Sequence, residues 1–234
     1  MMEICIVLPT YNERENIEAI LEKIFGVLPT VSVLVVDDNS PDGTGAMVNS
    51  LRSKYKKLLL KSRLGKEGLG KAYIDGFKDV LGKASHSHIV MMDADLSHDP
   101  KYLLPMIEAS KDYDVVVGSR YVGDGQTVGW ELWRRILSRY GNLYAHTITG
   151  MPIRDLTGGF NLMRCSVLEK VDFSDFDASG YAFIMELKAH LHRAGATFHE
   201  VPIVFKNRTG GESKISSHII SEGVMAPWRI RFKK

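Results

Sequence analysis

The chain has 234 residues and a mass of 26.2 kDa, and 44% of its residues are hydrophobic and 25% charged. This composition supports a sizeable hydrophobic core and excludes a largely disordered protein. With 30 basic against 28 acidic side chains, the net charge of +2 is too balanced for a dedicated nucleic-acid-binding protein.

The spacing of the cysteines and the lengths of the apolar runs predict where in the cell the protein resides. Cys5 and Cys165 form no CxxC pair, so a reducing compartment is expected rather than a disulfide scaffold or a zinc site. The acidic start at Met1 to Glu3 is unlike a signal peptide. No apolar stretch approaches the roughly 18 residues that a membrane span needs. These features predict a soluble intracellular protein.

The first 120 residues alternate between strands and helices. Apolar side chains at helical spacing follow the early strands. Alternation of this kind predicts crossover connections and a mostly parallel sheet flanked by helices. Five apolar runs predict buried strands, at residues 4–8, 33–36, 58–60, 88–92 and 114–118.

Beyond residue 120 the alternation weakens. Residues 130–149 and 181–193 have helical patterns, a glycine-rich turn surrounds Gly158 and Gly159, and residues 198–205 are a candidate last strand. The chain shows no internal repeat and no linker. We therefore expect one α/β domain over residues 1–234.

An Asp-Ala-Asp motif follows the fourth predicted strand. Open α/β sheets bind ligands at the carboxyl ends of their strands, which is where Asp93 and Asp95 lie. In extended chain, side chains two residues apart point to the same side, so both carboxylates can face one Mg²⁺ or Mn²⁺ ion completed by phosphate oxygens. The alternative is an ordinary helix start capped by Ser97 or Asp99, and the motif alone does not separate these interpretations.

Polar side chains also follow the first two strands. Glu13 comes after the first strand and Asp38 after the second, with Tyr11 available to stack on a planar ring. Taken singly, Glu13 can serve a helix dipole and Asp38 a turn. Together with Asp93 and Asp95 they should meet at one edge of the sheet, which favours a site for a nucleotide and a metal ion.

Longer motifs surround these residues and follow one another along nearly the whole chain. They are residues 7–13 (VLPTYNE), 35–44 (VVDDNSPDGT), 92–98 (MDADLSH), 118–121 (GSRY), 155–160 (DLTGGF) and Arg208 with 211–214 (GESK). In this order they resemble the family 2 glycosyltransferases of GT-A fold, and within them the dolichyl-phosphate mannosyltransferases. The resemblance implies a single GT-A-type, Rossmann-like domain with a mostly parallel sheet.

That resemblance implies a reaction. The family branch transfers mannose from GDP-mannose to dolichyl or another polyprenyl phosphate with inversion, giving dolichyl-phosphate mannose and GDP. Residues 1–120 would then form the nucleotide-sugar half and residues 121–234 the acceptor half. One alternative keeps the fold but uses UDP-glucose or another nucleotide sugar, and a second is a non-catalytic nucleotide-sugar-binding subunit.

The resemblance also implies roles for individual residues. Asp93 and Asp95 would bind Mg²⁺ or Mn²⁺, and the residues with catalytic roles would be Asp95, Arg120, Arg208 and Lys214. Candidates for the acceptor phosphate are Arg120, Lys214 and Arg164, the last because Asn161 stands where a basic residue is expected. The residues implied to hold the nucleotide sugar are Pro9, Tyr11, Glu13, Val36, Asp38, Asp93, Ala94, Asp95, Arg120, Arg208 and Lys214.

The residue types suit this chemistry. A nucleoside diphosphate must leave as an anion, and a metal ion with arginine and lysine side chains stabilises its charge. A phosphate acceptor is already ionised at neutral pH and needs no strong general base. This agrees with the lack of an obvious catalytic histidine or Ser–His pair in the sequence.

A polyprenyl-linked acceptor requires access to a membrane surface. Residues 130–149 and 218–234 mix aromatic, aliphatic and basic side chains and are candidate membrane-interface helices. The alternatives are ordinary core-facing helices with a solvated basic face, or recruitment by small membrane subunits. The resemblance implies a peripheral protein on the cytoplasmic face of the endoplasmic reticulum, or of the plasma membrane in an archaeon.

Overall fold

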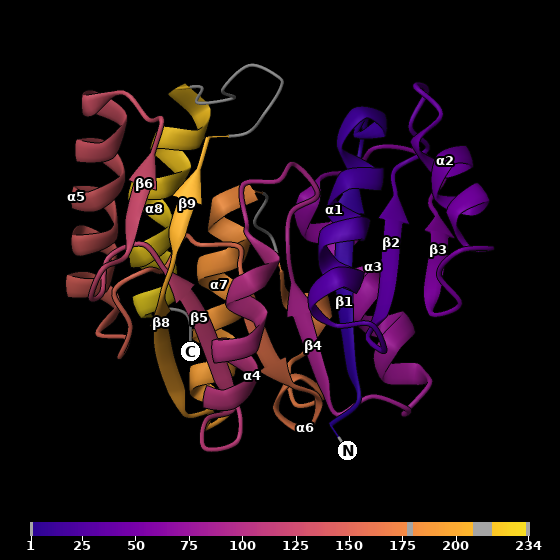
Figure 1. Cartoon of the computed structure of the whole chain (residues 1–234). Coiled ribbons are helices and arrows are strands. Elements are labelled where there is room, and N and C mark those ends of the chain that lie inside the picture. Colours follow the sequence, from indigo (N-terminus) through magenta and orange to yellow (C-terminus); the bar gives the residue numbers. More distant parts are fainter. Residues whose placement is uncertain (1, 177–179, 208–216, 233–234) are drawn as a thin grey trace.

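A seven-stranded sheet forms the centre of the computed structural model, which describes residues 2–176, 180–207 and 217–232 (Figure 1). Neighbouring strands are parallel except at β7, which runs antiparallel to β4 and β5. The order is β3-β2-β1-β4-β7-β5-β8, with bounds β1 (Ile4–Thr10), β2 (Ser32–Asp37), β3 (Leu58–Ser62), β4 (His88–Met91), β5 (Val115–Ser119), β7 (Asn161–Arg164) and β8 (Phe198–Pro202). A separate two-stranded sheet pairs β6 (Gln126–Val128) with β9 (Val204–Lys206).

Helices cover both faces of the large sheet, so the domain has three layers (Figure 1). One face carries α1 (Arg14–Val27), α2 (Thr44–Leu51) and α4 (Leu103–Ala109), the last preceded by a 3-10 turn at Pro100–Tyr102. The other face carries α3 (Leu69–Gly82), α5 (Leu132–Thr149), the short α6 (Cys165–Leu168), α7 (Gly180–Arg193) and α8 (Ser217–Phe232).

Alternate residues of the central strands supply the two cores. In β1, Ile4 and Ile6 pack on the side of α1, whereas Cys5 and Val7 pack on the side of α3. These side chains are all at most 8% exposed, and burying one of this size contributes roughly 1.5–3 kcal/mol. Because both faces of this strand are buried, its sequence is a continuous apolar run.

The expected single α/β domain with a mostly parallel sheet is confirmed, and each of the five predicted strands is present. The sequence pattern did not reveal β7, whose short segment Asn161–Arg164 has only two apolar residues. Residues 198–205 do not form one strand. The chain leaves the large sheet after Pro202, and the following residues form β9 against β6.

Helix α3 lies closest to the sheet at Gly76. A Cβ atom there would lie 2.6 Å from Cγ1 of Val7 and 3.2 Å from Cγ2 of Val36. Because both valines are fully buried in a close-packed core, we expect Gly76→Ala to lower the free energy of unfolding by about 1–3 kcal/mol. Urea denaturation followed by circular dichroism measures this difference.

The matched control is Gly82→Ala, at the last residue of the same helix. Nothing lies within 4 Å of a Cβ placed there, so the substitution should be neutral or stabilise the fold by up to ~1 kcal/mol. Equal loss of stability in the two variants would contradict close packing at Gly76.

Candidate active site

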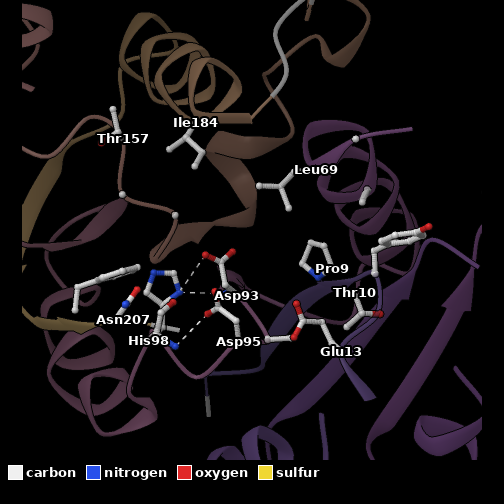
Figure 2. Close-up of a pocket in the computed structure, with 18 of the residues that line it drawn as sticks. Pro9, Thr10, Glu13, Leu69, Asp93, Asp95, His98, Thr157, Ile184 and Asn207 are labelled. Carbon is white, nitrogen blue, oxygen red and sulfur yellow. Dashed lines mark hydrogen bonds and ion pairs between the residues drawn. The ribbon is translucent and has the colours of Figure 1, made fainter. Parts of the chain in front are cut away.

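A pocket of about 360 Å³ opens at the carboxyl ends of β1, β2 and β4 (Figure 2). Its volume is in the range of small-molecule sites. Side chains from both halves of the chain line it. Residues up to His98 contribute Pro9, Thr10, Tyr11, Glu13, Asp38, Lys66, Gly68, Leu69, Ala72, Asp93, Ala94, Asp95, Ser97 and His98, and residues from Arg120 onward contribute Arg120, Trp130, Arg134, Thr157, Gly158, Gly159, Ile184, Phe205 and Asn207.

Hydrogen bonds lock the two loops that follow β1 and β2. The buried Asp37 carboxylate accepts from the hydroxyl of Thr10 at 2.8 Å and from the backbone N–H and hydroxyl of Ser40 at 3.0 and 2.6 Å. The backbone N–H of Glu13 donates to the hydroxyl of Thr44 at 3.0 Å. The two loops that carry these pocket-lining side chains are therefore held to each other by hydrogen bonds.

Arg63 fixes the carboxylate of Asp38 at the floor of this side of the pocket. Its side chain is only 5% exposed, and it donates to Asp38, to Asp75 at 2.7 Å and to Glu67 at 3.3 Å. The sequence pattern gave no sign of Arg63, because its three partners come from different elements.

The Tyr11 ring lies at the same rim. The ammonium group of Lys66 lies 4.1 Å from the centroid of that ring. A cation over an aromatic face at this distance is attracted to the ring. Tyr11 and Lys66 together form one wall of the pocket.

The loop after β4 presents Asp93 and Asp95 to the pocket (Figure 2). The Asp95 carboxylate accepts from the backbone N–H of Ser97 at 3.0 Å, and the hydroxyl of Tyr73 donates to Asp93 at 3.3 Å. Leu96 has a φ of 63°, a left-handed conformation that costs a side-chain-bearing residue roughly 1–2 kcal/mol. The tight loop that results brings both carboxylates to one side.

The sequence also allowed an ordinary helix start in this segment, capped by Ser97 or Asp99. Asp99 is the cap: its side chain accepts from the backbone N–H of Lys101 at 3.1 Å, at the start of the 3-10 turn. The capping role and the pocket role are thus divided between Asp99 and the Asp93/Asp95 pair.

His98 contacts the loop that carries Asp93. It is fully buried, and its ring stacks on Phe160 with a centroid distance of 5.0 Å. Burial lowers the pKa of His98, and a neutral imidazole has a nitrogen that can accept. The backbone N–H of Asp93 donates to its Nδ1 at 3.1 Å. The ring therefore helps to hold the loop.

On the other side of the pocket, Arg120 forms a buried ion pair with Asp155. The guanidinium donates from Nε and Nη2 to the two carboxylate oxygens at 2.8 and 2.7 Å, and also to the hydroxyl of Thr157 at 2.8 Å. Although burial would raise the pKa of Asp155, the Arg120 guanidinium and the Lys188 ammonium outweigh it and hold that pKa below its usual range. This pair fixes the direction of the Arg120 side chain.

The loop from Arg154 to Gly159 is held at several backbone atoms. The backbone N–H of Asp155 donates to Glu200 at 3.0 Å, and Asn142 accepts from the next two N–H groups at 2.9 and 3.2 Å. Lys188 of α7 donates to the carbonyl oxygens of Asp155 and Gly158 at 2.8 and 3.0 Å. Nothing in the local sequence around this loop indicated these partners, since they lie on α5, α7 and β8.

Arg134 is a second arginine in the pocket. Its guanidinium lies 4.1 Å from the centroid of the Trp130 ring, and it forms no ion pair with an acidic side chain among the described residues. In the sequence it stood out only as one basic residue of a mixed helix.

Most of the residues implied by the resemblance meet here, and three groups do not. The side chain of Val36 is fully buried in the core and does not line the pocket. The expectation for Arg164 was wrong. Since β7 runs antiparallel to β4, Arg164 lies opposite His88 at the far end of β4 and pairs with Asp114 at 3.0 Å. Arg208 and Lys214 lie outside the described residues.

Comparison with known sequences identifies the family of this chain. Residues 5–172 match Glycosyl transferase family 2. The chain is 40% identical over 230 residues to the polyprenol monophosphomannose synthase of Mycolicibacterium smegmatis, over 97% of this chain and 86% of that protein. It is 37% identical over 224 residues to the undecaprenyl-phosphate mannosyltransferase of Micrococcus luteus, over 96% of this chain and 92% of that protein.

Solved structures agree in fold. The glucosyl-3-phosphoglycerate synthase of Mycobacterium tuberculosis, in complex with Mn²⁺, UDP and glucosyl-3-phosphoglycerate, superposes with a TM-score of 0.68 at 19% identity, over 98% of this chain and 80% of that chain. The same enzyme with Mg²⁺ and UDP gives a TM-score of 0.67 at 18% identity, over 98% and 79% of the two chains. At such identity the likeness concerns the fold.

The mostly parallel sheet, with charged side chains in a pocket at the carboxyl ends of its strands, has the fold of these solved glycosyltransferase structures. The chain belongs to glycosyltransferase family 2 and is a glycosyltransferase. The two curated relatives are bacterial, so the expected location at the endoplasmic reticulum receives no support from them.

The buried Arg120–Asp155 pair predicts a pH-dependent contribution to stability. Removing one partner of such a pair leaves a buried charge uncompensated, so we expect Asp155→Asn to lower the free energy of unfolding at pH 7 by about 3–5 kcal/mol. The folded state lowers the pKa of Asp155, so its contribution is present at neutral pH and is lost as the pH falls through that lowered value. Urea denaturation at neutral and acidic pH measures both effects.

The difference between the wild type and Asp155→Asn should therefore shrink on acidification below the usual aspartate pKa of about 3.9. Asp112→Asn, which alters an exposed carboxylate, is the control and should change stability little at either pH. A difference for Asp155→Asn that stayed constant with pH would contradict the ion pair.

Proposed function

We propose that this glycosyltransferase transfers mannose from GDP-mannose to dolichyl or another polyprenyl phosphate, with inversion and with Mg²⁺ or Mn²⁺ as cofactor. The observation that carries the proposal is the pocket itself, which Asp93 and Asp95 line together with Arg120 and Arg134. The printed names of the two bacterial relatives, a polyprenol monophosphomannose synthase and an undecaprenyl-phosphate mannosyltransferase, support the sugar and the acceptor class.

The donors at the Asp93 loop fit a hard divalent cation. Asp93 and Asp95 line one side of the pocket, and the buried hydroxyl of Ser97 has no hydrogen-bond partner within the part of the chain that the structure describes. Within that part, no three histidine, cysteine or acidic side chains form a group that could hold a metal ion. Two carboxylates completed by phosphate oxygens are a usual arrangement for Mg²⁺. When bound, the ion would stabilise the charge of the leaving nucleoside diphosphate.

The first half of the chain would hold the nucleoside. Tyr11 offers an aromatic face to a base, and the Asp38 carboxylate, fixed by Arg63, offers an acceptor to the N–H groups at a base edge. Pro9, Glu13 and Ala94 would complete this side. This assignment makes residues 1–120 the nucleotide-sugar half.

The second half would hold the acceptor. A polyprenyl phosphate is an anion, and arginine is well suited to bind phosphate because its donors form a rigid planar fork. Arg120 and Arg134 lie on this side of the pocket, and Arg120 is proposed to contact the diphosphate of the donor as well as the acceptor phosphate. The phosphate oxygen would attack the anomeric carbon directly, without a strong general base. Arg208 and Lys214 are proposed to contact the phosphates as well.

The acceptor half also carries an exposed apolar surface. None of the described helices is long and apolar enough to cross a bilayer. Helices α5 and α8 pack against each other at the end of the large sheet opposite β3 (Figure 1). Their apolar side chains, between 41% and 73% exposed, are Leu132, Trp133, Ile136, Leu137, Tyr140, Leu143, Val224, Met225, Trp228 and Phe232.

Together with the exposed Arg135, Arg139, Arg229 and Arg231, this α5/α8 surface has the composition of helices that lie in a membrane interface. We propose that the enzyme binds the membrane peripherally through this surface, with or without small membrane subunits. The bacterial origin of both relatives favours a plasma membrane over the endoplasmic reticulum.

The reaction is tested with radiolabelled GDP-mannose, polyprenyl phosphate in detergent micelles and Mn²⁺. Label should pass into the organic phase only when lipid and metal are both present, and EDTA should abolish it. Asp95→Asn should lower the rate by about a hundredfold or more, since it removes stabilisation of the transition state. Asp112→Asn, an exposed aspartate outside the pocket, should retain the wild-type rate.

Transfer from UDP-glucose but not from GDP-mannose would keep the site and overturn the donor. Transfer that survived EDTA would contradict the metal. Failure of both nucleotide sugars with several lipid phosphates would contradict the proposed reaction as a whole.

Membrane binding is tested by sedimentation with vesicles containing an anionic lipid. Because a buried large apolar side chain contributes roughly 1.5–3 kcal/mol, the double variant Trp133→Ser/Trp228→Ser should bind vesicles at least about tenfold more weakly. The control is Leu64→Ser, which alters a side chain that is 99% exposed just after β3, at the other end of the sheet. Equal sedimentation of the double variant and the control would contradict the proposed surface.

A further inference from the structure

Lys188 is a buried lysine that the proposed reaction does not use. It is 1% exposed, in the middle of α7, and does not line the pocket. Burying an ammonium group is costly unless polar atoms replace its water. Here the carbonyl oxygens of Asp155 and Gly158 do so, at 2.8 and 3.0 Å. The loop that Lys188 holds is the one that carries the carboxylate partner of Arg120.

A neutral side chain would be enough to hold a loop of this kind. Asn142 holds the backbone N–H groups of the next two residues in the same loop without a charge. Using a charged donor for the carbonyl oxygens costs desolvation that an uncharged donor would avoid. The charge of Lys188 therefore calls for an explanation beyond hydrogen bonding.

Two cations and two carboxylates lie around the loop, and they are buried to different degrees. Asp155 is fully buried with one negative charge, and two buried cations, Arg120 and Lys188, lie next to it. Glu200, a half-buried carboxylate that also acts on Lys188, accepts the backbone N–H groups of Arg154 and Asp155. Without Lys188, the carboxylate of Asp155 would offset the charge of Arg120. Lys188 adds a second buried cation beside Asp155, so that this carboxylate offsets less of the charge that Arg120 presents to the pocket.

We propose that Lys188 is a positioning residue for phosphate-bearing ligands: it holds the Asp155–Gly158 loop that directs Arg120, and it offsets the charge of Asp155 so that Arg120 attracts anions. This inference rests on the proposed function, in which the pocket binds a nucleoside diphosphate and a lipid phosphate. Lys188 acts through Arg120 and the loop rather than by touching either substrate.

A change of pH separates the charge from the hydrogen bonds. Burial, opposed by the charges of Asp155 and Glu200 and assisted by that of Arg120, lowers the pKa of Lys188 to about 8. The ammonium is therefore charged at neutral pH and loses its charge as the pH rises through that value. The neutral amine can still donate to both carbonyl oxygens, so alkaline pH removes the charge and leaves the hydrogen bonds.

The test measures binding of GDP and of UDP with Mg²⁺ by isothermal titration calorimetry at about pH 7 and about pH 9.5. It compares the wild type with Lys188→Met, which removes charge and donors, and Lys188→Gln, which removes the charge but keeps an N–H₂ donor. The control is Leu191→Met, a volume-conserving change at a fully buried position of the same helix outside the pocket. Circular dichroism and urea denaturation establish that each variant is folded. If Lys188→Met does not fold, Lys188→Gln supplies the comparison.

At about pH 7 we expect Lys188→Met and Lys188→Gln to bind the nucleotide about tenfold more weakly than the wild type, a difference of about 1.4 kcal/mol. At about pH 9.5 the ratio of variant to wild-type Kd should fall to about two or three, because the wild type has itself lost the charge. Comparing proteins at one pH cancels the titration of the nucleotide. Leu191→Met should match the wild type at both pH values.

Wild-type affinity in both Lys188 variants, or a loss of affinity that is the same at both pH values, would overturn the inference and leave Lys188 a structural residue. If the wild type bound neither GDP nor UDP, the proposed function would fail, and this inference with it. The two failures are distinguishable, because the second is visible in the wild type alone.

Discussion

The buried ion pair between Arg120 and Asp155 is the interaction on which the pocket depends. It joins the end of β5 to the loop before β7, and its two charges are buried almost completely. A buried pair is stable only when hydrogen bonds satisfy its remaining atoms. The dense set of backbone contacts from Glu200, Asn142 and Lys188 around this loop follows from that requirement. The side of the pocket that is proposed to bind the acceptor is therefore held by hydrogen bonds to three separate elements, α5, α7 and β8.

The opposite side of the pocket, which is proposed to bind the donor, is organised by a different constraint. Its functional side chains stand on short loops at the ends of parallel strands, and each loop is held by a neighbouring one, as Asp37 shows for the turns after β1 and β2. The left-handed Leu96 beside Asp95 is a local cost of this arrangement. The two large apolar cores contribute the stability that offsets this conformational cost. Strained and buried polar groups gather at the pocket, as expected of a functional site.

Features that depend on residues close together in the sequence could be predicted, whereas features that depend on distant partners could not. The strands, the parallel sheet and the meeting of Glu13, Asp38, Asp93 and Asp95 follow from apolar runs and the chemistry at their ends. Arg63 and Lys188 could not be found in this way, because the contact that ties each to the pocket is with a residue distant in the sequence, Asp38 for Arg63 and Asp155 for Lys188. Arg164 was misplaced for a related reason: the antiparallel strand β7, invisible in its short pattern, carries it away from the pocket.

The two halves of the pocket differ in charge, and this difference fits the direction of the proposed reaction. Acidic side chains gather on the donor side, where a divalent cation would bring a diphosphate, and arginines gather on the acceptor side, where a lipid phosphate would arrive. Arg134 links that acceptor side to the α5/α8 surface, because it lies on the same helix as the exposed Trp133 and Leu137. If α5 lies in the interface as proposed, Arg134 stands at the level of lipid headgroups. A phosphate on a membrane-embedded chain would then reach the pocket while its polyprenyl tail stays in the bilayer.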